Sequence, residues 1–155
     1  KNIKRVRRRF YGYFTKAALS GKNRPCVSLK PLWELKEEGV PMFIISNAKD
    51  SYLKVSIKKL GLKGLFRGVY GSGKFKSKDE MLKKLFRKFG IKASEAVYVG
   101  DRFSDVEYAR AAGCVAVAIH NKCAWSSLAE INREKPDYIV RDFYGLRKVI
   151  RAVSC

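Results

Sequence analysis

The chain has 155 residues, 46% of them hydrophobic, which is enough for one domain with one core. It holds 34 basic and 14 acidic residues, a net charge of +20, and this excess favours polyanionic partners or strongly anionic substrates. A solvated basic face, balanced by acids elsewhere in a longer protein, is the alternative. No window approaches 18 uncharged apolar residues and no signal-peptide core is visible, so we expect no membrane association and a cytoplasmic location.

The predicted elements alternate between helices and short apolar strands. A basic helix is expected near residues 2–19. Further helices are predicted near residues 28–38, 49–60, 78–89, 104–112, 123–132 and 142–152. Strands are predicted near residues 41–46, 67–70, 96–99, 114–119 and 137–140. This alternation predicts an α/β fold with a doubly wound parallel sheet.

Two polar residues, Ser46 and Asn47, end the strand predicted near residues 41–46. Both side chains can hydrogen-bond a phosphate oxygen. The backbone amides beyond them open the next helix, and helix N-termini bind anions. Ser46 and Asn47 are therefore candidate phosphate-binding residues.

A lysine, Lys78, is predicted in the first turn of a helix because Ser77 and Glu80 form a capping box. A cation at a helix N-terminus opposes the helix dipole, so Lys78 destabilises the helix unless an anion lies nearby. Lys78 is therefore the candidate catalytic lysine, and Lys76 is the alternative. The surrounding basic cluster comprises Lys74, Lys76, Lys78, Lys83, Lys84, Arg87 and Lys88.

Two carboxylates follow the strand predicted near residues 96–99: Asp101 comes directly after Gly100, and Asp105 follows four positions later. Open α/β folds bind ligands at this carboxyl edge of the sheet. Clustered carboxylates suit a hard cation such as Mg²⁺. The alternative role is structural, because Asp101, Ser104 and Asp105 are all good helix N-cap residues.

The four cysteines, Cys26, Cys114, Cys123 and Cys155, show no CxxC spacing and have only His120 nearby. This pattern disfavours a zinc site and favours buried thiols in a reducing compartment. Cys114 begins an apolar run, and His120 is expected in the loop that follows it.

The order Ser46, Lys78, Asp101 resembles the haloacid dehalogenase-like (HAD) hydrolase superfamily, closest to its phosphoglycolate-phosphatase-like branch. Ile44-Ile-Ser-Asn47 is similar to the second motif of that family, Lys78 to the third, and Val99-Gly-Asp-Arg-Phe-Ser-Asp105 to the fourth. The resemblance covers roughly residues 25–150. A flavodoxin-like receiver domain uses similar residue types, but its acidic pair comes before the Ser/Thr and the Lys, so the order here excludes it.

The resemblance implies hydrolysis of a small phosphate monoester through an aspartyl-phosphate, with Mg²⁺ as cofactor. Ser46 and Asn47 would bind the phosphoryl group, and Lys78 would neutralise its developing charge. Asp101 would ligate Mg²⁺, and Asp105 would be a second ligand or would orient the site.

The first motif of the family, Asp-x-Asp-x-Thr, has no counterpart here, since no acid precedes Glu34. Residues 1–24 instead resemble the last helix of the family's helical cap, and residues 25–155 a core domain that lacks its first strand. Alternatively, Tyr11-Gly-Tyr-Phe-Thr15 is a vestigial first motif with tyrosines at both Asp positions. That alternative would bury the unpaired charges of residues 7–9, at several kcal/mol per ion.

Four expectations concern this gap. The nucleophile is not in this chain, and the missing strand comes from upstream residues, from a second chain, or from residues near 9–14. The strands predicted near residues 41–46 and 96–99 are not hydrogen-bonded neighbours. If the chain is not catalytic, its charge predicts a relative of HAD enzymes that binds nucleic acid or ribosomes.

Overall fold

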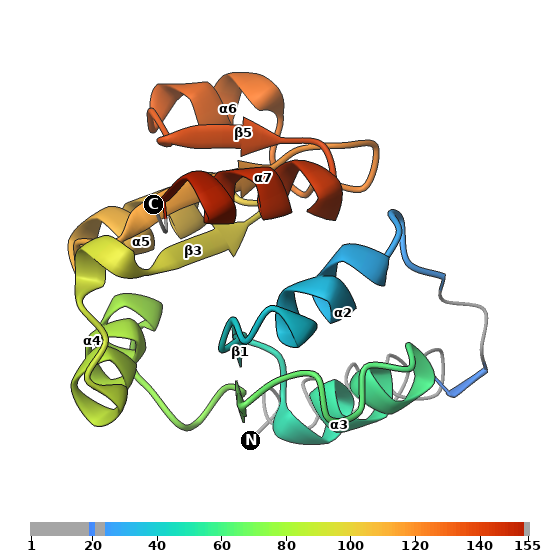
Figure 1. Cartoon of the computed structure of the whole chain (residues 1–155). Helices are drawn as coiled ribbons and strands as arrows, with labels where there is room; N and C mark the ends of the chain where they lie inside the picture. Colours follow the sequence, from blue (N-terminus) through green and yellow to red (C-terminus); the bar gives the residue numbers. More distant parts are fainter. Residues whose placement is uncertain (1–18, 21–23, 154–155) are drawn as a thin grey trace, which may run out of the picture. The chain divides into compact units, whose positions relative to one another are not determined.

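The computed structural model describes residues 19–20 and 24–153, and its elements alternate between helices and strands (Figure 1). The helices are α2 (Lys30–Glu37), α3 (Asp50–Lys59), α4 (Lys78–Phe89), the 3-10 helix η1 (Ala93–Glu95), α5 (Phe103–Ala112), α6 (Leu128–Arg133) and α7 (Phe143–Val153). The strands are β1 (Phe43–Ile45), β2 (Gly68–Tyr70), β3 (Val97–Gly100), β4 (Val115–Ile119) and β5 (Tyr138–Val140). Among the described residues, no helix is long and apolar enough to cross a membrane.

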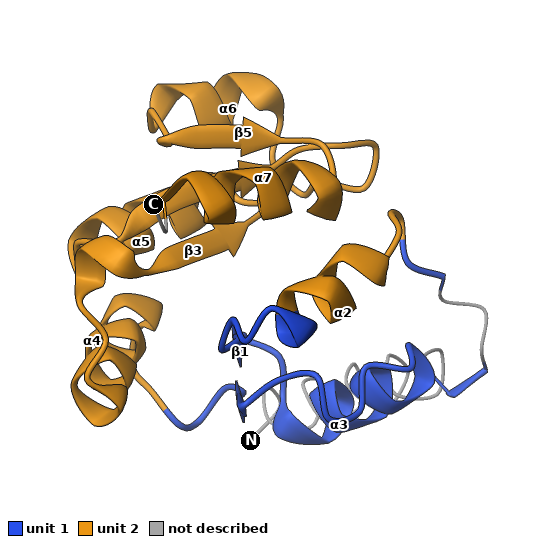
Figure 2. Ribbon diagram, viewed as in Figure 1, with its two compact units in different colours: residues 1–25, 36–74 blue, residues 26–35, 75–155 orange. Residues whose placement is uncertain are grey.

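The chain divides into two compact units (Figure 2). Unit 1 contains residues 36–74, with those up to 25, and unit 2 contains residues 26–35 and 75–155. In unit 1, β1 and β2 pair in parallel, and in unit 2 the strand order is β3-β4-β5, again parallel. These parallel sheets with flanking helices confirm the predicted α/β class.

The sheet of unit 2 has two chemically different faces, because alternate residues of a strand point to opposite sides. Valines of β3 and β4 pack with Leu146 and Val149 of α7 in one apolar cluster. The opposite face carries Tyr98 with the small residues Ala116 and Ala118, and α5 packs on β3 and β4. Small side chains on this face let α5 approach the sheet closely.

Strands β1 and β3 belong to different sheets among the described residues, as predicted. β1 pairs with β2, starting at Phe43 opposite Gly68, and β3 pairs with β4, starting at Val97 opposite Val115. Each strand thus has one described strand partner. The insertion of a further strand between them remains a prediction.

The sequence predictions of element positions agree with the structure except at α6. Helix α4 spans the predicted residues 78–89, and the other described α-helices and strands agree within two residues at each end, whereas the short 3-10 helix η1 was not predicted. The basic helix predicted near 2–19 lies almost wholly outside the described residues, so the division into 1–24 and 25–155 remains a prediction. The helix predicted from residue 123 was wrong at its start, because Ser127 is the N-cap and accepts the Glu130 N–H.

The cysteine prediction was wrong for two of the four residues. Cys26 and Cys123 form a disulfide across 97 positions of sequence. Cys114 is a buried free thiol as predicted, and its burial raises its pKa to about 11. Cys155 lies outside the described residues. Sequence spacing concealed the disulfide because only the folded chain brings residues 26 and 123 together.

The disulfide attaches the segment before α2 to the rest of unit 2, and a second connection lies within α2 itself. This second connection is an ion pair between Glu34 of α2 and Arg147 of α7. The rest of unit 2 begins only at residue 75. The disulfide and the ion pair therefore attach residues 26–34 to a part of the chain that is distant in sequence.

We expect the double substitution Cys26→Ser/Cys123→Ser to lower the free energy of unfolding by about 2–4 kcal/mol. Closing a long loop removes conformational entropy from the unfolded chain. Urea unfolding with and without dithiothreitol measures the effect. The reductant should destabilise the wild-type chain and leave the double variant unchanged; equal stability of the oxidised and reduced wild-type chain would contradict the assignment.

We expect Gly100→Ala to destabilise unit 2 by about 1–3 kcal/mol, because the new methyl group would overpack the site. A Cβ at position 100 would lie 2.3 Å from Cβ, Cγ and Oδ2 of Asp105. Gly145→Ala is the matched control, since its Cβ would lie 3.2 Å from its nearest atom, on Val140. Urea unfolding should show the larger loss at position 100; a smaller loss there would refute the close packing of β3 and α5.

Candidate functional site

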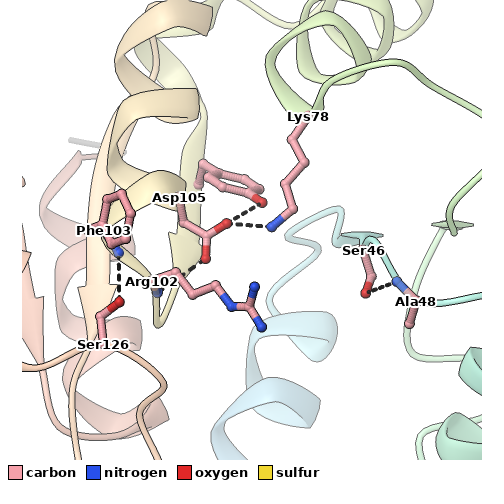
Figure 3. Close-up of polar contacts among 8 residues, drawn as sticks. Ser46, Ala48, Lys78, Arg102, Phe103, Asp105 and Ser126 are labelled. Carbon is pink, nitrogen blue, oxygen red and sulfur yellow. Dashed lines mark hydrogen bonds and ion pairs between the residues drawn. The ribbon is translucent and has the colours of Figure 1, made fainter. Parts of the chain in front are cut away.

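Lys78 lies at the first position of α4 and forms an ion pair with Asp105 of α5 (Figure 3). Ser77 is the N-cap of α4 and accepts the Glu80 N–H, so the predicted start of this helix is confirmed. The Lys78 Nζ lies 2.5 Å from Oδ1 of Asp105, and the two side chains are only 12% and 7% exposed. The anion that a lysine at this helix N-terminus requires is therefore supplied by the chain itself.

Asp105 is buried, and both of its carboxylate oxygens are engaged. Oδ1 accepts from Lys78 and, at 3.3 Å, from the hydroxyl of Tyr98. Oδ2 accepts the backbone N–H of Arg102 at 3.3 Å (Figure 3). A buried carboxylate is stable only when it is paired and hydrogen-bonded, and this one is.

Two tyrosine rings flank the Lys78 ammonium group. Its Nζ lies 5.8 Å from the ring centroid of Tyr98 and 5.7 Å from that of Tyr108. Burial, together with the negative charge of Asp105, raises the pKa of Tyr98 well above its usual range. Tyr98 therefore stays protonated and donates to Asp105 at any physiological pH.

Asp101 lies in the loop between β3 and α5, and its side chain is engaged on one oxygen. Oδ2 accepts the backbone N–H of Trp125 at 3.1 Å. Among residues 24–153, Oδ1 has no hydrogen-bond or ion-pair partner. The Asp101 side chain is half-buried. The hydrogen bond from Trp125 holds the carboxylate in place and leaves Oδ1 able to bind a ligand.

A complete protein metal cage is not present in the described part of the chain. No group of three or more His, Cys, Asp or Glu side chains there could hold a metal ion. Asp105 lies four residues after Asp101, but its oxygens bind Lys78, Tyr98 and Arg102. Asp101 is therefore the available carboxylate of the predicted pair.

Ser46 and Asn47 follow β1 and belong to unit 1, whereas Lys78, Asp101 and Asp105 belong to unit 2. The Ser46 N–H donates to the Tyr70 carbonyl at 2.9 Å, which extends the pairing of β1 with β2. The Ser46 hydroxyl oxygen accepts the Ala48 N–H at 3.1 Å (Figure 3). Its own hydroxyl proton can still be donated to an anion.

The structure distinguishes the two candidate lysines. Lys78 is paired and mostly buried, whereas Lys76 is exposed in the loop before α4. His120 lies in the loop after β4, as predicted, where its backbone N–H donates to Val140 at 2.8 Å.

Sequence reasoning missed the residues that position the carboxylates: Tyr98, Trp125 and Ser126. Ser126 is buried, and its hydroxyl oxygen accepts the Phe103 N–H at 3.2 Å (Figure 3). The Ser126 N–H donates to the Asp101 carbonyl at 3.1 Å. One signal was readable: Ser127 and Glu130 have capping-box spacing, which would have placed residues 123–126 in a loop. No local pattern indicates that this loop contacts Asp101.

Comparisons with known proteins identify the family of the chain. A model of the haloacid dehalogenase-like hydrolase family matches residues 3–119. The phosphoglycolate phosphatase of Pectobacterium atrosepticum is 26% identical over 156 residues, which cover 96% of this chain and 64% of that protein. The chain therefore spans less than two thirds of the length of this curated relative.

Two solved structures share the fold. A structure described as a predicted phosphoglycolate phosphatase from Haemophilus somnus has a TM-score of 0.71 at 24% identity, covering 77% of this chain and 54% of that one. A HAD family hydrolase from Deinococcus radiodurans, with bound phosphate and sodium, has a TM-score of 0.69 at 20% identity, covering 80% of this chain and 57% of that one. Because the family model spans most of the sequence, from the basic N-terminal residues to the end of β4, the chain belongs to the haloacid dehalogenase-like hydrolase family.

Proposed function

We propose that the protein containing this chain hydrolyses a small phosphate monoester with the help of Mg²⁺. The observation that carries the proposal is the buried Lys78–Asp105 pair, because Asp105 lies in the first turn of α5, four residues after Asp101 at the carboxyl end of β3. A fixed ammonium group suits an anionic substrate, and an available carboxylate suits a hard cation. The likeness to phosphoglycolate phosphatases supports the same reaction class.

In this proposal Lys78 stabilises the phosphoryl group, and Asp105 positions Lys78. An ammonium group has three donors, so a bond to Asp105 leaves others for phosphoryl oxygens. Asp105 holds the lysine in one orientation before substrate arrives, and such preorganisation makes electrostatic catalysis effective. Of the two roles expected for Asp105, its contacts favour the orienting one over metal ligation.

The donor chemistry of Asp101 fits one ligand of Mg²⁺. This ion commonly binds through one or two carboxylates and completes its shell with waters and substrate phosphate. Asp101 brings one oxygen without a described partner and a second oxygen fixed by the Trp125 N–H. When bound, Mg²⁺ would neutralise charge on the phosphate.

Ser46 and Asn47 are proposed to donate hydrogen bonds to the phosphoryl oxygens. The attacking carboxylate of an aspartyl-phosphate mechanism has no counterpart before Glu34, so we propose that a residue outside this sequence supplies it. This chain then contributes the residues that bind and stabilise the phosphoryl group, and by itself it is inactive.

A cytoplasmic location is part of the same proposal. The Cys26–Cys123 disulfide is unusual for a reducing cytoplasm, but intracellular proteins of hyperthermophiles are an exception. The sequence has no glutamine and one threonine, a composition that fits a hot-living source.

We expect Asp101→Asn to lower kcat/KM of the whole protein for p-nitrophenyl phosphate by more than about 100-fold. Loss of a residue that only supports a metal ligand already lowers activity by about 10- to 100-fold, and loss of the metal ligand itself should lower it further. EDTA should abolish the activity and Mg²⁺ should restore it. Glu107→Gln, an exposed acid on α5, is the matched control and should change little. Activity that resists EDTA or survives Asp101→Asn would refute the metal assignment.

A second candidate function is binding of nucleic acid or ribosomes without catalysis. The specific observation is the outer face of α4, where Lys83, Lys84, Arg87 and Lys88 are all exposed. Lys83 lies 3.8 Å from Asp79, while Lys84 and Arg87 have no acidic partner among the described residues. Two pairs spaced four residues apart place these cations on adjacent turns, where they can contact successive phosphates.

If α4 binds RNA through about six phosphates, the log–log salt slope should be about −4 on single strands and about −5 on duplexes. A gel-shift series over salt measures it. Replacing Lys84, Arg87 and Lys88 by Gln should make the slope less negative by about 2 to 3 units. The same replacement at Lys58, Lys59 and Lys63 is the control and should change the slope less. Absence of binding at low salt would refute this function.

A further inference from the structure

Trp125 is the most exposed large hydrophobic residue of the described chain, with 74% of its surface open to solvent. Tryptophan has a large apolar surface that proteins normally bury or use at binding sites. Phe103, which follows Arg102 in the chain, is a further exposed aromatic residue at 42%. Phe103 begins α5 directly after the Asp101–Arg102 loop, and Trp125 lies in the loop between β4 and α6.

The exposure of Trp125 does not come from a loosely attached loop. Residues 120–127 are tied to the Asp101 loop by three hydrogen bonds: the Trp125 N–H to the Asp101 carboxylate at 3.1 Å, the Ser126 N–H to the Asp101 carbonyl at 3.1 Å, and the Phe103 N–H to the Ser126 hydroxyl at 3.2 Å. Nearer the start of the same loop, Cys123 forms its disulfide with Cys26, and the Asn121 side-chain amide donates to the Arg141 carbonyl at 3.0 Å. The backbone that presents the indole is therefore fixed before any ligand arrives, which lowers the entropic cost of binding.

Arg102 covers the indole of Trp125. Its guanidinium carbon lies 4.5 Å from the ring centroid, within the range of a cation–π contact. Arg102 is exposed and has no carboxylate partner among the described residues, so its charge remains available to an anion. A planar cation stacked on an exposed indole combines an aromatic surface with a positive charge.

We infer that the Arg102–Trp125 stack binds the leaving group of the substrate, and that this group is a planar aromatic ring. The inference rests on the proposed function, because the substrate phosphate must lie at Asp101. The Trp125 backbone N–H donates to that carboxylate, and Arg102 directly follows Asp101 in the chain, so both residues of the stack are attached to the proposed phosphate site. An aryl or heteroaryl phosphate can then stack its ring on Trp125 and Arg102, which we call the platform. A short aliphatic phosphate gains no binding energy from the indole.

The test uses two phosphonates that cannot be hydrolysed, benzylphosphonate and cyclohexylmethylphosphonate, in buffer with Mg²⁺. They carry the same charge and nearly the same size and differ in the aromatic ring. The chain has two tryptophans, so a Trp33→Phe background leaves Trp125 as the sole tryptophan reporter. We expect benzylphosphonate to quench Trp125 fluorescence and to bind roughly three- to ten-fold more tightly than its cyclohexyl counterpart.

Substitutions test whether the Arg102–Trp125 stack causes the preference for the aromatic ligand. The affinity of each variant is measured by calorimetry. Trp125→Leu should remove the aromatic preference, and Tyr144→Leu, at another exposed aromatic residue in unit 2, should keep it. Arg102→Gln should weaken benzylphosphonate binding, and Arg133→Gln, at an exposed arginine of α6, should not. Because all four side chains are exposed, these variants are expected to fold.

Equal affinity of the two phosphonates for the starting protein would overturn the inference, as would an aromatic preference that persists in Trp125→Leu. These results are independent of turnover. A whole protein that fails to hydrolyse p-nitrophenyl phosphate while the aromatic preference is present removes the proposed function and leaves the platform. Hydrolysis without any aromatic preference leaves the proposed function and removes the platform.

Discussion

Lys78 and Asp105 form a largely buried ion pair that connects α4, α5 and β3, and the arrangement of the site depends on it. Burying either charge alone would cost several kcal/mol, so each side chain requires the other. The carboxylate also accepts from Tyr98 and from the Arg102 N–H, which ties the end of the strand to the start of the helix. Gly100 makes this possible, because any Cβ there would overlap Asp105.

The engagement of Asp105 determines what Asp101 can do. Two carboxylates four residues apart suggest a shared cation, but one of them is occupied by the chain's own lysine. Asp101 keeps one oxygen without a described partner, and its other oxygen accepts from Trp125. The two carboxylates therefore differ in their surroundings: Asp105 binds a cationic side chain of the chain itself, and Asp101 keeps the oxygen that we propose as a ligand of Mg²⁺.

The loop of residues 120–127 is the second determinant of the site. Its hydrogen bonds to Asp101 and Phe103 stabilise the β3–α5 connection, and the disulfide at Cys123 attaches the same loop to the segment before α2. This segment thus contacts the proposed metal ligand and also carries the exposed Trp125. This coupling explains why a loop that is distant in sequence from Asp101 contributes to the site.

Much of the local structure was determined by the sequence alone. The Ser77–Glu80 box starts α4 at Lys78, Gly90 ends it in a left-handed conformation, and the apolar run before Gly100 forms β3. Such features depend on neighbours within a few residues, so local patterns predict them well. The positions of Lys78 and Asp101 at the ends of these elements followed from the same patterns.

Only the tertiary structure decided the partners of those residues. The pairing of Lys78 with Asp105 spans 27 positions, that of Trp125 with Asp101 spans 24, and the disulfide spans 97. Contacts at such separations depend on how helices and strands pack, and composition, spacing and periodicity carry no record of that packing. For this reason the candidate residues could be named from the sequence, whereas the different partners of Asp101 and Asp105 could not.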